Sequence, residues 1–251
     1  MDRKDLVNAH FRDLKNVFSD LELKEIENGR FIITGNLSFT VCHYGKSVKD
    51  DYDVEIEIPS DYPQNPPTVK EISHKIPRNM DNHVNQEDGT LCLGAPLAVK
   101  RTFAKERSLL WFVRAQLIRF LSSYSYKRDY GLFPNGELSH GDKGMLEYYS
   151  DLFSVQDNWQ VLGMLKILAD DNYRGHALCP CGSNKKVRNC HGALLKEIRD
   201  YQKTTDYMIE YINILNLLKS NNPNKNLIKY IPKELIKHKK KKKRKLITKK
   251  P

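Results

Sequence analysis

Four side chains with metal-ligand chemistry lie close together in the C-terminal third of the chain: Cys179, Cys181, Cys190 and His191. Thiolate and imidazole are the donors that a tetrahedral zinc ion takes. The Cys-Pro-Cys turn presents two sulfur atoms together, and eight residues later Cys190-His191 supplies the second pair. Because four protein ligands leave no open coordination position, this spacing predicts a structural Zn²⁺ site. The alternative, three cysteines buried by chance, does not explain the adjacent histidine.

A second candidate for chemistry is Cys92, which follows a polar loop that carries His83 and Asn85. A cysteine nucleophile needs a partly exposed thiol and hydrogen-bond donors for the oxyanion that forms when it attacks an acyl group. The carboxamide of Asn85 is one such donor. The competing interpretation is that Cys92 is a small core residue, as free cysteines often are.

The elements that would position these residues follow the order of an α+β protein, not an alternating βαβ one. The clearest strand is 51–58, where Val54, Ile56 and Ile58 alternate with acidic residues, so that one face is buried and the other wet. A proline-rich loop follows it at 61–67. The other expected elements are helices 2–18, 108–124, 145–153, 158–171 and 193–220, strands 31–41 and 68–73, and a loop-rich stretch at 125–144.

The net charge of +11 is concentrated at the C-terminus. Residues 237–251 contain ten basic and no acidic residues, so the rest of the chain carries a net charge of only +1. Such a run repels itself and buries nothing, which predicts a disordered basic tail over 221–251. The functional alternative for this Lys-rich tail is a weak, salt-sensitive contact with nucleic acid or an acidic partner.

The sequence also indicates the compartment. The first residues are charged, and no apolar run approaches the roughly 18 residues of a membrane span, so we expect no membrane partner. Five cysteines, three of them close together, indicate metal-bound thiols and a reducing compartment, hence a cytoplasmic protein. No glycine-rich phosphate-binding pattern is present, so ATP-dependent chemistry would need another protein.

The segment CPCGSNKKVRNCHG closely resembles the SEC-C motif, a zinc knuckle of many bacterial proteins. The resemblance implies a zinc knuckle over 179–192 that docks to protein partners. Asn184 stands where the motif often has glycine, a departure that spares the four ligands.

A second resemblance covers roughly residues 1–160, which are similar to the ubiquitin-conjugating enzyme family. That family has a YP-x-x-PP loop, a His-Pro-Asn motif, a catalytic cysteine in a G-x-[IL]-C-L context and a later tryptophan. The matching residues are Tyr62, Pro63, Pro66, Pro67, His83, Asn85, Gly89, Cys92, Leu93 and Trp111.

The second resemblance implies a fold with an N-terminal helix, an antiparallel meander sheet and C-terminal helices. It implies that Cys92 carries the C-terminal carboxylate of a partner protein as a thioester, that Asn85 hydrogen-bonds the oxyanion and that His83 holds the loop. The sequence departs from the family in three places. Val84 replaces the motif's proline, and the spacing from Asn85 to Cys92 is one residue shorter than in the family. The 94–110 stretch is longer than in the eukaryotic enzymes and could form a lid or a partner-docking loop.

The two resemblances together imply the domain order: a catalytic domain over 1–160, a connection over 161–178, the knuckle over 179–192, a helix over 193–220 and the tail. This order resembles stand-alone conjugating proteins of bacterial anti-phage operons that signal through cyclic oligonucleotides. There the conjugated partner is a cGAS-like nucleotidyltransferase. Two other classes stay open, a non-catalytic zinc-containing adaptor and a nucleic-acid-binding or ribosome-associated protein.

Overall fold

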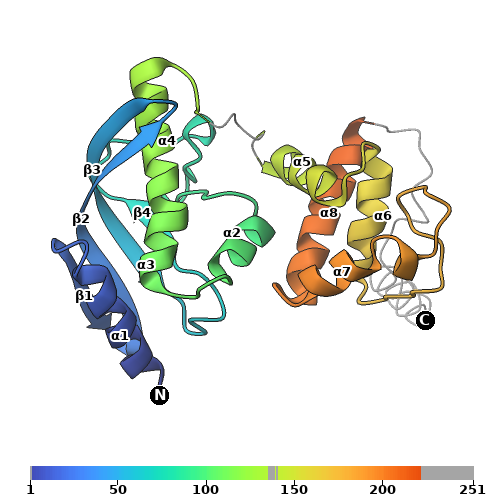
Figure 1. Ribbon diagram of the computed structural model, residues 1–251, viewed down its shortest axis with the longest axis horizontal. Helices are drawn as coiled ribbons and strands as arrows, with labels where there is room; N and C mark the ends of the chain where they lie inside the picture. The colour runs from blue at the N-terminus through green and yellow to red at the C-terminus, as the bar shows by residue number, and fades with distance from the viewer. Residues whose placement is uncertain (1, 135–138, 140, 222–251) are drawn as a thin grey trace, which may run out of the picture. The chain divides into compact units, whose positions relative to one another are not determined.

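The computed structural model describes residues 2–134, 139 and 141–221 and divides the chain into two compact units, Met1–His140 and Gly141–Pro251 (Figure 1). The first unit combines a sheet with helices and the second is helical, so the α+β prediction is confirmed. The predicted boundary at residue 160 is wrong, because it falls inside helix α6 (Asn158–Ala169). The predicted basic tail lies outside the described residues, apart from Asn221.

The sheet of the first unit is an antiparallel meander in the order β1-β2-β3-β4. Strands β1 (Leu21–Ile26), β2 (Arg30–His43), β3 (Lys46–Ile58) and β4 (Thr68–Glu71) form it. In β3, Val54, Ile56 and Ile58 are buried as the alternation predicts, and in the paired β2, Phe31 and Ile33 are buried with them. The sequence pattern does not predict β1, because this edge strand pairs with β2 alone and Leu21 is its only fully buried residue.

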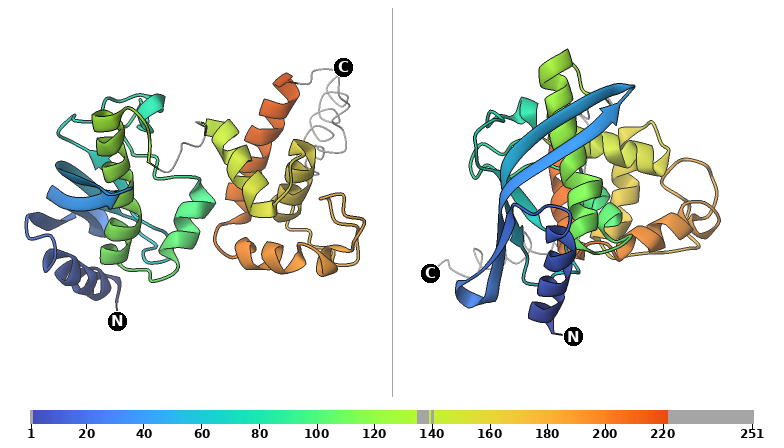
Figure 2. Two further views of the ribbon diagram at one scale, coloured as in Figure 1. Left: turned by 45° about the horizontal axis from the view of Figure 1, so that its top comes forward. Right: turned by 60° about the vertical axis from the view of Figure 1, so that its left-hand side comes forward.

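Helices cover one face of the sheet (Figures 1 and 2). The helical run that packs across β2 and β3 consists of α3 (Leu109–Phe112), a π-helical turn η3 (Val113–Leu117) and α4 (Ile118–Tyr130). Helix α1 (Arg3–Lys15) packs on α3 and β1, and the Asp2 carboxylate caps its first turn by accepting from the Asp5 N–H. The side chains between the helices and the sheet form one apolar core.

Two segments expected to be loops are helical. The 94–110 stretch contains α2 (Pro96–Phe103), which begins at a proline, the residue that suits the first turn of a helix. The 125–144 stretch is helical up to Tyr130, because Tyr124, Ser125 and Tyr126 are buried, and α5 begins at Gly141.

The second unit packs α5 (Gly141–Phe153), α6 and α8 (Thr204–Asn221) against one another, with α7 (Gly192–Arg199) directly after the Cys/His segment. The predicted single helix over 193–220 is wrong, because the chain turns after α7. The buried Gln202 donates to the Glu210 carboxylate at 3.0 Å, and the Tyr207 hydroxyl donates to the Ile198 carbonyl. These contacts hold the turn between α7 and α8, and α8 packs on α5 and α6.

No helix within the described ranges has both the length and the apolar composition needed to cross a membrane.

Candidate metal centre and candidate cysteine nucleophile

The ligand atoms of Cys179, Cys181, Cys190 and His191 all lie within 4.8 Å of one another. The Cys181 and Cys190 sulfur atoms are 3.5 Å apart, and His191 Nδ1 lies 3.3 Å from the Cys179 sulfur and 3.2 Å from that of Cys190. Around a tetrahedral zinc ion, the usual bond lengths place two sulfur atoms about 3.8 Å apart and sulfur and nitrogen about 3.5 Å apart. A disulfide would instead bring two sulfur atoms to about 2.05 Å. The cluster therefore has the dimensions of a metal site.

A short antiparallel pairing brings the first two ligands into place. Leu178 pairs with Lys186, and the Cys179 N–H donates to the Lys185 carbonyl at 2.8 Å. In the turn between Leu178 and Lys186, Gly182 has φ of 80°, a conformation that favours glycine, and a Cβ there would meet the side-chain nitrogen of Gln160 at 2.7 Å.

The second pair of ligands follows the 3₁₀ turn η4 (Val187–Asn189), because the Cys190 N–H donates to the Val187 carbonyl at 3.0 Å. His191 is held by a backbone group of another helix. Its Nε2 lies 2.8 Å from the carbonyl oxygen of Phe153, the last residue of α5. Since a carbonyl only accepts, Nε2 carries the proton and the Nδ1 lone pair faces the sulfur atoms, an outer contact typical of metal-bound histidines. No local pattern in the sequence points to the Phe153 carbonyl as a partner of His191.

Two thiols of the cluster have opposite pKa shifts. Burial raises the pKa of Cys179 to about 11. Burial also opposes ionisation of Cys181, but hydrogen bonds from the Ser183 hydroxyl, 3.2 Å away, and the Ser183 amide outweigh it and lower the pKa to about 6. Ser183 Oγ is also 3.3 Å from the Cys190 sulfur. Ser183 therefore stabilises negative charge on the side of the cluster nearer to solvent.

Cys92 lies on a second short antiparallel pairing, in the first unit. Val84 pairs with Leu91, and the Cys92 N–H donates to the His83 carbonyl at 2.8 Å. Val84 and Leu91 are buried and anchor this pairing in the core. Cys92 is exposed, and its thiol lies 3.9 Å from the Gly94 carbonyl oxygen. The structure thus does not support the core-residue alternative for Cys92.

The same pairing places His83 directly opposite Cys92. Asn85 and Cys92 each directly follow a buried residue of this bridge and are both exposed, so they lie on the side away from Val84 and Leu91, whereas His83 has a left-handed backbone with φ of 54° and stands outside this alternation. The Asn85 carboxamide oxygen accepts from the Glu87 N–H at 3.1 Å, which orients its NH₂ group as a donor. The His83 ring meets Phe133 edge-on at 5.9 Å between centroids.

Helix α2 follows the Cys92 segment and is tied to the main helical run by two side chains. Trp111 Nε1 donates to the Thr102 carbonyl at 2.8 Å. Gln116, buried in the π-helical turn, donates to the Val99 carbonyl at 3.2 Å. The sequence analysis identified Trp111 but not Gln116. The feature that could have indicated Gln116 is its position as a polar residue within an apolar helical stripe.

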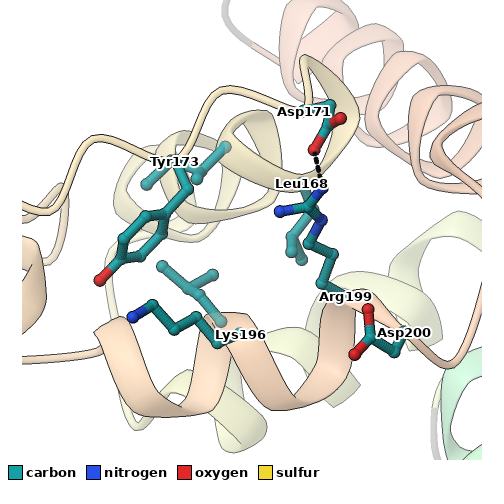
Figure 3. A pocket seen from close by; sticks show the side chains of 8 residues that line it. Leu168, Asp171, Tyr173, Lys196, Arg199 and Asp200 are labelled. Atoms are coloured by element: carbon teal, nitrogen blue, oxygen red, sulfur yellow. Dashed lines mark ion pairs between the residues drawn. The ribbon is translucent and has the colours of Figure 1, made fainter.

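The second unit also contains a cavity of about 250 Å³ between the end of α6 and α7 (Figure 3). Arg199 forms an ion pair with Asp171 across it at 2.9 Å, and Lys196 lies over the Tyr173 ring at 5.1 Å from its centroid. Leu168 and Leu195 line it. Both charged residues of the ion pair are about half exposed, so it fixes α7 only weakly.

No protein-family model, no curated protein and no solved structure matches the chain. The two resemblances therefore rest on the sequence motifs alone.

Proposed function

We propose that the chain is a cysteine acyltransferase that carries the C-terminus of a partner protein as a thioester on Cys92. The observation that supports this most is the exposed Cys92 thiol, whose backbone N–H donates to the His83 carbonyl, with the exposed Asn85 on the opposite segment of the same short pairing. An exposed thiol is accessible to a large substrate, and here a backbone hydrogen bond, not a mobile side chain, fixes the position of the cysteine.

The reaction has two steps. The Cys92 thiolate attacks the carbonyl carbon of a C-terminus that a separate enzyme has activated as an acyl adenylate, so that a C–S bond forms and AMP leaves. A primary amine of the target then attacks the thioester. A C–N bond forms, the C–S bond breaks, the thiolate is regenerated and the proton of the amine passes to water or a base.

Asn85 and His83 have different roles in this proposal. The Asn85 NH₂ group hydrogen-bonds the oxyanion of each tetrahedral intermediate, because its oxygen is already used by the Glu87 N–H. His83 holds the loop through its carbonyl, which accepts from Cys92, and its ring, which packs on Phe133. His83 is therefore a positioning residue.

The Cys/His cluster is proposed to hold a structural zinc ion. Three sulfur atoms and one imidazole nitrogen at these separations fit Zn²⁺, and four protein ligands leave no coordination position for a substrate. The ion would fix the Cys179–His191 segment against α5 and α6. On the family resemblance, we propose that the cargo is the C-terminus of a cGAS-like nucleotidyltransferase in cytoplasmic anti-phage defence.

The test is to co-express the chain with its genomic neighbours and to separate the products on denaturing gels with and without thiol reductant. The expected product is a reductant-sensitive adduct that mass spectrometry identifies as a thioester of Cys92. Cys92→Ala should abolish it, Cys92→Ser should trap the same cargo as an ester, and Asn85→Ala should slow its transfer by about 10²-fold or more. The matched control is Cys42→Ser, because Cys42 is the other exposed cysteine of the first unit.

An adduct that survives Cys92→Ala would refute the proposal, as would full biological activity of that variant. The second result would favour a non-catalytic adaptor. That alternative is supported by the Cys/His cluster, whose four side chains form a closed set with no position for catalysis.

A further inference from the structure

The short pairing that carries the first two metal ligands has an outward and an inward face. Cys179 and Val187 are buried on the inward face, with exposed fractions of 5% and 1%. Leu178 is 67% exposed and pairs directly with Lys186, which is also exposed. The outward face therefore presents an apolar side chain beside a cation.

Further basic side chains gather at the same place. The Arg188 N–H donates to the Gly175 carbonyl at 3.0 Å, so Arg188 lies against the turn that contains Gly175, between Arg174 and His176. The side chains of Arg174, His176 and Arg188 are all exposed. We call the set Arg174, His176, Leu178, Lys186 and Arg188 the basic ribbon.

The charge of the basic ribbon differs from that of its unit. Residues 141–221 contain ten acidic and ten basic residues, whereas residues 172–192 contain four basic residues and no acidic one. Within the described part of the chain, the three cations of the ribbon form no ion pair; Arg174 only donates to the Asn172 carboxamide oxygen at 3.2 Å. The ribbon is a local concentration of uncompensated positive charge.

We propose that the basic ribbon binds single-stranded nucleic acid through its phosphate groups. Arginine and lysine supply the phosphate contacts, and the exposed imidazole of His176 with Leu178 offers a surface on which a base can stack. An acidic protein partner fits less well, because stable protein interfaces bury about 800 Å² a side around aromatic or arginine anchors in pockets, and the ribbon exposes a single leucine. The inference is independent of Cys92 chemistry, since all its residues lie in the second unit.

The test measures binding of the full-length protein to fluorescein-labelled oligouridylate by fluorescence anisotropy from 50 to 300 mM salt. The variant Lys186→Ala/Arg188→Ala removes two ribbon cations. Its control Lys203→Ala/Lys219→Ala removes two exposed cations elsewhere in the same unit and leaves the C-terminal basic run unchanged. Each phosphate contact contributes about 0.7 to the slope of log Kd against log salt. We therefore expect a slope lower by about 1.4 and binding weaker by about 25-fold at 0.1 M salt, with the control close to wild type.

Equal affinities for the ribbon variant and its control would overturn the proposal. Displacement of the oligonucleotide by poly-L-glutamate as efficiently as by unlabelled oligouridylate, at equal charge, would also overturn it and assign the ribbon to acidic proteins. If the double variant fails to fold, each single variant should weaken binding by about fivefold at 0.1 M salt, and wild-type affinity in both single variants would be equally decisive against it.

Discussion

Gly163→Ala in α6 should weaken metal binding although Gly163 is not a ligand. A Cβ at this position would lie 2.9 Å from the Pro180 Cβ, and Pro180 stands between the ligands Cys179 and Cys181. Carbon atoms prefer separations of about 3.5 to 4.0 Å, so the turn must move by about 0.6 to 1.1 Å. Overpacking of this kind costs about 1 to 3 kcal/mol, and the better helix propensity of alanine offsets about 1 kcal/mol of it. Because the displaced residue lies between two ligands, we expect metal affinity at least tenfold lower, which corresponds to about 1.4 kcal/mol.

The affinity can be measured by Co²⁺ titration followed by Zn²⁺ competition, since the Co²⁺ absorption spectrum also reports tetrahedral sulfur coordination. Pro180→Gly removes the atom that Gly163→Ala would meet, so a double-mutant cycle separates the steric effect from the effect of each substitution alone. We expect the double variant to bind metal more tightly than the sum of the single effects predicts. Wild-type affinity in Gly163→Ala, or a cycle with no coupling, would refute the steric reasoning.

Two further predictions concern stability and the metal. Burial opposes ionisation of Asp50, but hydrogen bonds from Ser125, Arg128 and other groups lower its pKa from 3.8 to about 2. Because the pKa of Asp50 is lower in the folded state, its carboxylate stabilises the fold above about pH 4, and this contribution is lost as pH falls towards 2. Asp50→Asn should therefore lower the free energy of unfolding in urea by up to about 2 kcal/mol at pH 7 and reduce the loss of stability at acid pH. An unchanged loss of stability at acid pH in the variant would contradict this. His191→Ala removes a ligand and should reduce the metal content of purified protein at least tenfold by elemental analysis, whereas full metal content would argue against Nδ1 ligation.

Local patterns predicted the elements in which burial and sequence period agree. Val54, Ile56 and Ile58 show strict alternation, and β3 contains the predicted 51–58 segment but begins five residues earlier, at Lys46. The predictions failed where tertiary contacts decide. The 193–220 stretch has helical periodicity throughout, yet the chain turns at 200–203, where Gln202 donates to Glu210 and Tyr207 donates to the Ile198 carbonyl, contacts over eight and nine residues that a continuous helix would not make. Pro96 is a local sequence feature that indicates the start of α2, whereas the sequence pattern that indicates β1 is weak.

The candidate sites were predictable in composition but not in surroundings. The four side chains of the Cys/His cluster are close in sequence, so their spacing alone predicted that they would lie together. The groups that complete the site come from elsewhere: the Phe153 carbonyl ends α5, and Gly163 lies in α6 opposite Pro180. These contacts depend on how the helices pack, and no local sequence pattern encodes them.

Both candidate sites depend on the register of a short antiparallel pairing. Each rests on one antiparallel bridge, Val84 with Leu91 and Leu178 with Lys186, next to the cysteine in question. A slip of one residue would reverse the faces, so that Cys92 would turn inward and Leu91 outward. The buried Val84 and Leu91 oppose this slip, since exposing one leucine side chain costs about 1.5 to 3 kcal/mol. The apolar neighbours of Cys92 therefore determine that its thiol faces solvent, and the same reasoning holds for the basic ribbon, where the buried Val187 keeps its neighbour Lys186 exposed.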